Sequence, residues 1–66
     1  GCGGDPASVQ EMALNFGIDY FLLDDSLRHH PDFTVDENFF RRYFPISAEF
    51  PNSENTIIFD LRRMLN

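Results

Sequence analysis

Apolar side chains recur at three- and four-residue steps near the start of the chain, at Val9, Met12, Ala13 and Phe16. This spacing is typical of a helix with one buried face. Asp5 can cap such a helix and Pro6 suits its first turn, so the pattern predicts a helix over 6–16. Gly17 follows at a position where a helix can end in the left-handed conformation.

The same apolar stripe continues beyond Gly17, at Tyr20, Leu23 and Leu27. Two interpretations follow from it: a second helix over 19–29, or one long helix that bends at Gly17. We favour two separate helices, because Asp19 can cap a new start. Pro31 ends whichever helix reaches it, since proline lacks the backbone N–H that a helix interior needs.

A capping box, in which Thr34 is followed three residues later by Glu37, predicts the next helix over 35–44. Pro45 ends this helix. One side of it carries four aromatic rings, those of Phe39, Phe40, Tyr43 and Phe44. Residues 45–53, which contain two prolines, are predicted to form a connector.

The final apolar pattern predicts a helix over 54–65, which Ser53 opens. Its apolar face consists of Ile57, Leu61, Met64 and Leu65. The segment 56–61 also suits a strand by composition. We favour the helix because the pattern indicates no partner strand.

Together these elements predict an all-α fold, a small bundle of three to four short helices. The bundle forms a single domain over 5–66, preceded by a flexible stretch or a leftover of recombinant expression at 1–4. The segment 12–23 is apolar around nearly its whole helical circumference. A helix of that kind needs cover on more than one side. We therefore expect an intertwined or face-to-face homodimer, because two-fold dimers are the commonest closed assembly.

The composition supports an interface. Ten aromatic residues occur among 66, and all five basic residues are arginine. Buried protein contacts favour aromatic residues and arginine over lysine. Arg42 and Arg62 have no evident local partner, so we expect them to reach across the interface. The predicted interface consists of Leu14, Ile18, Phe21, Leu22, Phe40, Phe44, Arg42 and Arg62.

The net charge of −6 disfavours nucleic acid as a partner, because phosphate backbones repel an acidic surface. The longest apolar run, at 20–23, is far too short to span a bilayer. Cys2 is the only cysteine and cannot form an internal disulfide, which suits a cytoplasmic or nuclear location. The chain begins without Met, so we expect it to be a fragment of a larger protein.

No arrangement of residues predicts catalysis, a cofactor or a metal. His29 and His30 are adjacent, and neighbouring helical residues point about 100° apart, so they suit a helix C-terminus better than a shared metal. A chain of this size is also expected to lack room for a pocket of about 300 Å³ or more. The predicted function is homodimerisation or oligomerisation within a larger scaffold or regulatory protein. The alternative is a monomeric three-helix adaptor that binds a partner peptide or helix in an aromatic groove.

Overall fold

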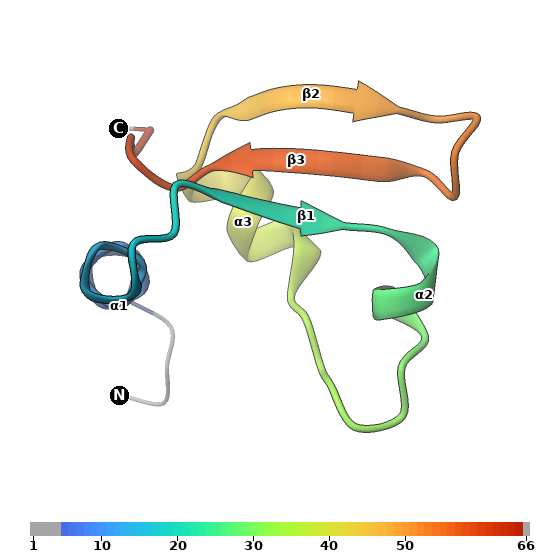
Figure 1. Cartoon of the computed structure of the whole chain (residues 1–66), viewed down its shortest axis with the longest axis horizontal. Coiled ribbons are helices and arrows are strands. Elements are labelled where there is room, and N and C mark those ends of the chain that lie inside the picture. The colour runs from blue at the N-terminus through green and yellow to red at the C-terminus, as the bar shows by residue number, and fades with distance from the viewer. Residues whose placement is uncertain (1–4, 66) are drawn as a thin grey trace.

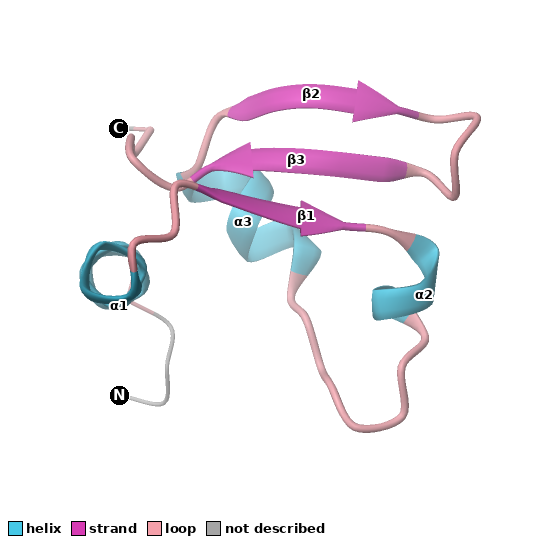
Figure 2. Ribbon diagram, viewed as in Figure 1, coloured by secondary structure: helices cyan, strands magenta, loops and turns pink. Residues whose placement is uncertain are grey.

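A computed structural model describes residues 5–65 and shows an α+β fold (Figures 1 and 2). The predicted flexible stretch 1–4, with Cys2, lies outside the described residues. The elements are α1 (Pro6–Phe16), β1 (Tyr20–Leu23), α2 (Asp25–Arg28), α3 (Glu37–Tyr43), β2 (Ile46–Phe50) and β3 (Thr56–Asp60). The strands form one antiparallel sheet in the order β1-β3-β2. The predicted all-α bundle is therefore wrong.

The first helix has the predicted bounds. Asp5 caps α1, and its carboxylate accepts a hydrogen bond of 3.1 Å from the Ala7 N–H. Gly17 ends α1 at φ +68°, and its N–H donates to carbonyls of the last turn. Because this left-handed residue ends the helix completely, the alternative of one bent helix through Gly17 is also excluded.

The predicted helix over 19–29 is wrong. Residues Tyr20–Leu23 form β1, and only the four residues of α2 are helical, with Asp24 as their cap. All four residues of β1 pair with β3, from Tyr20 opposite Asp60 to Leu23 opposite Ile57. Successive side chains of a strand point to opposite faces, so β1 directs Phe21 and the buried Leu23 to one face of the sheet and Tyr20 and Leu22 to the other.

The third helix is shorter than predicted and has a different cap. It covers Glu37–Tyr43 within the predicted range 35–44. Asp36, not Thr34, caps it, because the Asp36 carboxylate accepts a hydrogen bond of 3.2 Å from the Phe39 N–H. The predicted capping box at Thr34 is therefore wrong, although it indicated the correct neighbourhood.

A hairpin replaces the predicted connector 45–53 and the predicted helix 54–65. β2 and β3 pair antiparallel, and the chain reverses between them where Glu54 and Asn55 have φ of 56° and 50°. Thr56, Ile57 and Ile58 are β-branched and favour the strand. β3 is the central strand and pairs on both sides, so the partner that the sequence pattern did not indicate is present twice.

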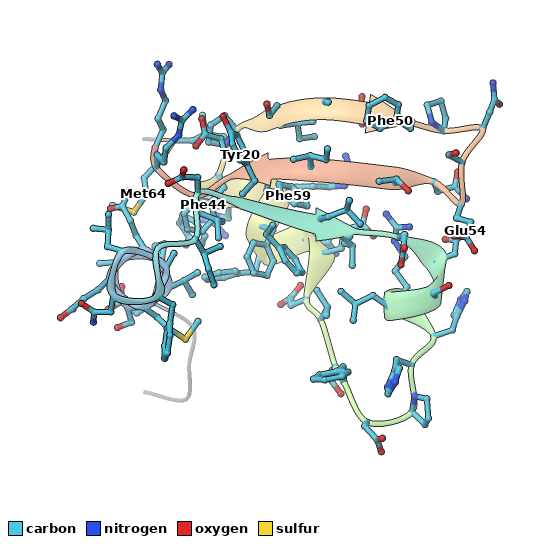
Figure 3. All side chains as sticks on the ribbon, viewed as in Figure 1. Tyr20, Phe44, Phe50, Glu54, Phe59 and Met64 are labelled. Carbon is cyan, nitrogen blue, oxygen red and sulfur yellow. The ribbon has the colours of Figure 1, made fainter. Side chains whose placement is uncertain are left out.

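The core lies between one face of the sheet and the three helices (Figure 3). Ala13 from α1, Leu23 from β1, and Ile57 and Phe59 from β3 are buried, and Leu27 from α2 packs against them. The rings of α3 complete the cluster. The centroid of the Phe40 ring lies 4.7 Å from that of Phe21 and 5.6 Å from that of Phe59. We call the face that carries these residues the inner face of the sheet.

Candidate functional surfaces

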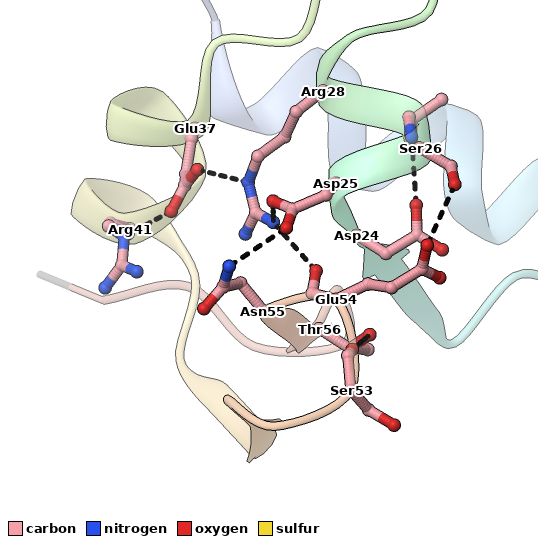
Figure 4. A network of polar contacts seen from close by, with 11 residues as sticks. Asp24, Asp25, Ser26, Arg28, Glu37, Arg41, Ser53, Glu54, Asn55 and Thr56 are labelled. Carbon is pink, nitrogen blue, oxygen red and sulfur yellow. Dashed lines mark hydrogen bonds and ion pairs between the residues drawn. The ribbon is translucent and has the colours of Figure 1, made fainter.

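A polar network joins α2, α3 and the β2–β3 turn around Arg28 (Figure 4). The Arg28 guanidinium donates to Glu37 at 2.8 Å and to Asp25 at 3.0 Å. Glu37 uses its second oxygen to accept from Arg41 at 2.9 Å. Asp25 likewise uses its second oxygen to accept from the Asn55 amide at 2.9 Å. Each carboxylate is thus held by two donors, and the network fixes α2 against the end of the sheet.

These contacts shift the acidity of the network. The hydrogen bond from Asn55, with help from Arg28, holds the pKa of Asp25 below its ordinary value of 3.8, although burial opposes this. The hydrogen bond from Arg28, followed by that from Arg41, lowers the pKa of Glu37 below 4.5. Glu37 in turn raises the pKa of Arg28. All these groups are therefore charged at neutral pH.

The network borders a groove of ≈ 450 Å³. The expectation that so short a chain leaves no room for a pocket of about 300 Å³ is therefore wrong. The groove is lined by Asp25 and Arg28 of α2, Glu37 and Arg41 of α3, Glu49 and Pro51 at the end of β2, and Asn55, Thr56 and Ile57. Sequence reasoning did not indicate this groove, because its walls come from segments that are distant along the chain.

The second candidate surface is the face of the sheet opposite the helices, which we call the outer face. The strand register places Leu22, Ile58 and Ala48 in one row across the three strands. Tyr20 and Phe50 lie on the same face toward its ends. Tyr20, Leu22 and Phe50 are 44%, 50% and 49% exposed, although each is large and apolar or aromatic. Figure 1 shows α3 behind the sheet, so this helix leaves the outer face bare.

One edge of the sheet carries features that discourage pairing with another strand. β2 is an edge strand, and Pro45 and Pro51 flank it. Its register shifts between Ile46 and Ala48, and Glu49 places a charge on the inner face. Prolines, bulges and inward-pointing charges are the devices by which proteins protect sheet edges. Among the described residues, the outer face is therefore a better site for association than the β2 edge.

The structure separates the residues of the predicted interface. Leu14, Ile18 and Leu22 are exposed, Leu14 by 70%. Phe21 and Phe40 are half-buried against the core. Phe44 is completely buried, so its side chain is not available to a partner. The outer-face residues that sequence reasoning missed, Ala48, Phe50 and Ile58, lie in a region predicted as connector and helix. The β-branched and aromatic composition of 56–60 was the signal that could have revealed a strand there, and with it the position of Ile58.

The two arginines predicted to reach across an interface have partners in the chain itself. Arg62 pairs with Asp60 at 3.1 Å, lies 4.9 Å from the centroid of the Tyr20 ring and donates to the Tyr20 hydroxyl at 2.8 Å. The expectation that Arg62 lacks a local partner is therefore wrong. Hydrogen bonds from Arg62 hold the pKa of Asp60 below its ordinary value. Arg42 lies 5.4 Å from the centroid of the neighbouring Tyr43 ring.

The histidine pair lies at the end of α2. His29 is the C-cap residue, and His30 accepts a hydrogen bond of 3.1 Å from the Asp32 N–H through Nδ1. The His30 ring also packs 4.9 Å from that of Phe33. Within residues 5–65, no group of three or more His, Cys, Asp or Glu side chains is arranged to hold a metal ion.

No helix in the described part of the chain has the length and apolar character needed to cross a membrane. Comparison with models of protein families, with curated proteins and with solved structures found no match to this chain.

Proposed function

We propose that this protein is a protein–protein interaction module that forms a homodimer, with the outer faces of two sheets packed against each other. The observation that carries this proposal is the apolar row Leu22, Ile58 and Ala48, flanked by Tyr20 and Phe50, on the face without helices. Sheets pack face to face through such rows of side chains. A two-fold axis through the row places the same apolar patch on both sides of the contact.

The size of the patch sets how far the contact must extend. One strand of four residues and two of five cover at most about 17 Å by 14 Å, from strand spacings of about 4.8 Å and rises of about 3.4 Å per residue. A typical interface takes about 800 Å² of accessible surface from each partner, and the whole surface here is 4881 Å². The contact must therefore extend to the rim, where the Arg62 guanidinium lies 4.9 Å from the centroid of the Tyr20 ring.

The function proposed is therefore oligomerisation, with a second copy of the chain as the first partner. The parent protein in this proposal is a larger scaffold or regulatory protein, in the cytoplasm or nucleus. The single cysteine supports that location, because reducing compartments disfavour disulfide frameworks. We do not propose a three-helix adaptor with an aromatic groove. The fold is not a helical bundle, and rings such as Phe40 and Phe59 pack into the core.

The test is the mass in solution of the protein and of a matched pair of variants. We expect a concentration-dependent rise from 7.7 kDa toward twice that value in multi-angle light scattering. Leu22→Glu places a charge in the centre of the outer face and is expected to keep the mass at 7.7 kDa. The control is Phe33→Glu, because Phe33 is equally apolar and exposed but lies in the α2–α3 loop, which extends away from the sheet (Figure 1).

Both variants change an exposed position, so each is expected to keep the circular dichroism spectrum of the unsubstituted protein. The outer face is not the interface if the Leu22→Glu variant dimerises as well as the unsubstituted protein. The same follows if Phe33→Glu dissociates the dimer as much as Leu22→Glu does. A protein that stays at 7.7 kDa at every concentration contradicts the homodimer itself.

A further inference from the structure

The groove beside the Arg28 network contains one cationic and one anionic side chain whose terminal atoms are not used by the fold. Arg41 bonds to Glu37 only through Nε, at 2.9 Å, and is 45% exposed. Its two terminal nitrogens have no partner among residues 5–65. Glu49 borders the same groove from β2, and within the described residues its carboxylate accepts no hydrogen bond and forms no ion pair.

These two groups lie on different walls of the groove and do not neutralise each other. Arg41 belongs to α3 and Glu49 to β2, and they form no ion pair within the 4.0 Å that defines one. The β2–β3 register places Glu49 opposite Ile57, whose side chain is buried on the inner face. Glu49 therefore points to the side of the sheet on which Arg41 lies, and the groove separates the two charges.

The other charged groups of the groove are already occupied. Asp25 accepts from Arg28 and Asn55, and Glu37 accepts from Arg28 and Arg41. These bonds hold the walls in place and leave Arg41 and Glu49 as the available donor and acceptor. Pro51 and Ile57 add apolar surface to the same groove.

The charge balance decides which kind of ligand fits. The groove is lined by three carboxylates and two guanidinium groups, in a protein of net charge −6. A simple anion is repelled by this surplus, and a simple cation leaves the donors of Arg41 unused. A molecule with one negative group, one positive group and a short apolar part satisfies both Arg41 and Glu49. The volume of ≈ 450 Å³ lies in the range of about 300–1,000 Å³ that ligand pockets occupy.

We propose that this groove binds a small zwitterion of the α-amino acid type. Its carboxylate accepts hydrogen bonds from the terminal nitrogens of Arg41, and its ammonium group donates to Glu49. Its side chain lies against Ile57 and Pro51. The site lies on the helix side of the sheet, so it is separate from the proposed dimer surface, and either proposal can fail without the other.

The test is a titration of isotope-labelled protein with leucine, followed by amide chemical shifts. We expect saturable shifts around Arg41, Glu49 and Ile57. Two analogues serve as chemical controls: N-acetyl-leucine lacks the ammonium group, and leucine amide lacks the carboxylate. Each is expected to bind at least about tenfold more weakly, because a hydrogen bond to a charged group contributes about 1.5–3 kcal/mol and 1.4 kcal/mol corresponds to tenfold.

Two variants test the assigned residues. Arg41→Gln and Glu49→Gln are each expected to weaken leucine binding by about tenfold or more. Arg63→Gln and Glu11→Gln remove the same charges at exposed positions outside the groove and are expected to leave binding unchanged. The proposal is overturned if leucine causes no saturable shifts, if either analogue binds as well as leucine, or if the groove variants bind like their controls. Mass in solution is unaffected by any of these outcomes.

Discussion

The two faces of the sheet differ in burial although the residues that form them are chemically alike. Leu23 is completely buried, whereas its neighbour Leu22 is 50% exposed. In β3, Ile57 and Phe59 are buried, while Ile58 between them is only partly covered. All three helices supply residues to the inner face, from Val9 and Ala13 to the rings of α3. Cover by the helices, and not the hydrophobicity of a residue, therefore decides which apolar side chains are buried.

The largest expected difference in stability between the two faces comes from removing one aromatic ring from each face in turn. Phe59→Ala removes a completely buried ring and leaves a cavity beside Phe40 and Phe21, so we expect a loss of about 3–5 kcal/mol in the free energy of unfolding. Phe50→Ala on the outer face removes a ring that is already 49% exposed, so the loss is about 1 kcal/mol. Urea unfolding followed by circular dichroism, at a concentration where the protein is monomeric, measures the loss for Phe50→Ala, and the circular dichroism of Phe59→Ala without urea shows how far that variant is unfolded.

A domain of this size has only a few kcal/mol of stability, so Phe59→Ala is expected to be largely unfolded at 25 °C. Phe59→Leu keeps most of the apolar volume and is expected to stay folded with a smaller loss. Equal losses for Phe59→Ala and Phe50→Ala would show that the two faces do not differ in packing as described.

Removing an ion pair on each side of the sheet is expected to give a smaller difference in stability. Glu37→Gln weakens the bonds to Arg28 and Arg41 on the inner side, where the Glu37 side chain is 29% exposed, and we expect a loss of about 1 kcal/mol. Arg62→Gln weakens the pair with Asp60 at the rim of the outer face, where the arginine is half exposed, and a smaller loss is expected. Thermal unfolding at low and high salt measures both. A larger effect of Arg62→Gln would contradict this ranking.

Acid is expected to act through the same carboxylates. The folded-state pKa values of three carboxylates lie below their ordinary values. Asn55 and Arg28 lower the pKa of Asp25, and Arg28 and Arg41 lower that of Glu37. Arg62 lowers that of Asp60. Below the ordinary values of 3.8 and 4.5 the unfolded chain therefore binds more protons, so the stability present at neutral pH falls as the pH drops through the folded-state values. The midpoint of urea unfolding should be flat from about pH 6 to 8 and decrease below about pH 4.5.

The control for this prediction is the Glu37→Gln variant, whose midpoint should depend less steeply on pH in the acid range. If the urea midpoint of the unsubstituted protein rises on acidification from pH 5 to 3, the assigned contacts are contradicted, because the sign of the change is reversed.

Local signals in the sequence predicted α1 and the approximate position of α3. Asp5 and Gly17 act on backbone groups a few residues away, so their effect is readable from neighbouring residues alone. The sheet was missed because strand pairing is nonlocal. Tyr20, Leu23 and Leu27 repeat at helical spacing, yet Tyr20 pairs with Asp60 and Leu23 with Ile57. A short apolar run fits a strand and a helix equally well until its partner is known.

The candidate surfaces were predictable to different degrees. An apolar surplus within 12–23 was expected, and Leu14, Ile18 and Leu22 are indeed exposed. Contact of these residues with a second copy stays a prediction. Their arrangement was not predictable, because the period of two in β1 and β3, and not a helical period, determines which side chains share a face. The groove was not predictable at all, since it depends on a tertiary contact between Arg28 and Glu37.

The most direct test of the central claim is a search for contacts between copies by nuclear magnetic resonance. One copy is isotope-labelled and the other is not, and only magnetisation transfer between copies is recorded. We predict transfer between the methyl groups of Leu22 and Ile58 in one copy and the rings of Tyr20 or Phe50 in the other. The account is contradicted if no transfer between copies is seen at concentrations where the mass is that of a dimer, or if the only contacts arise from α1.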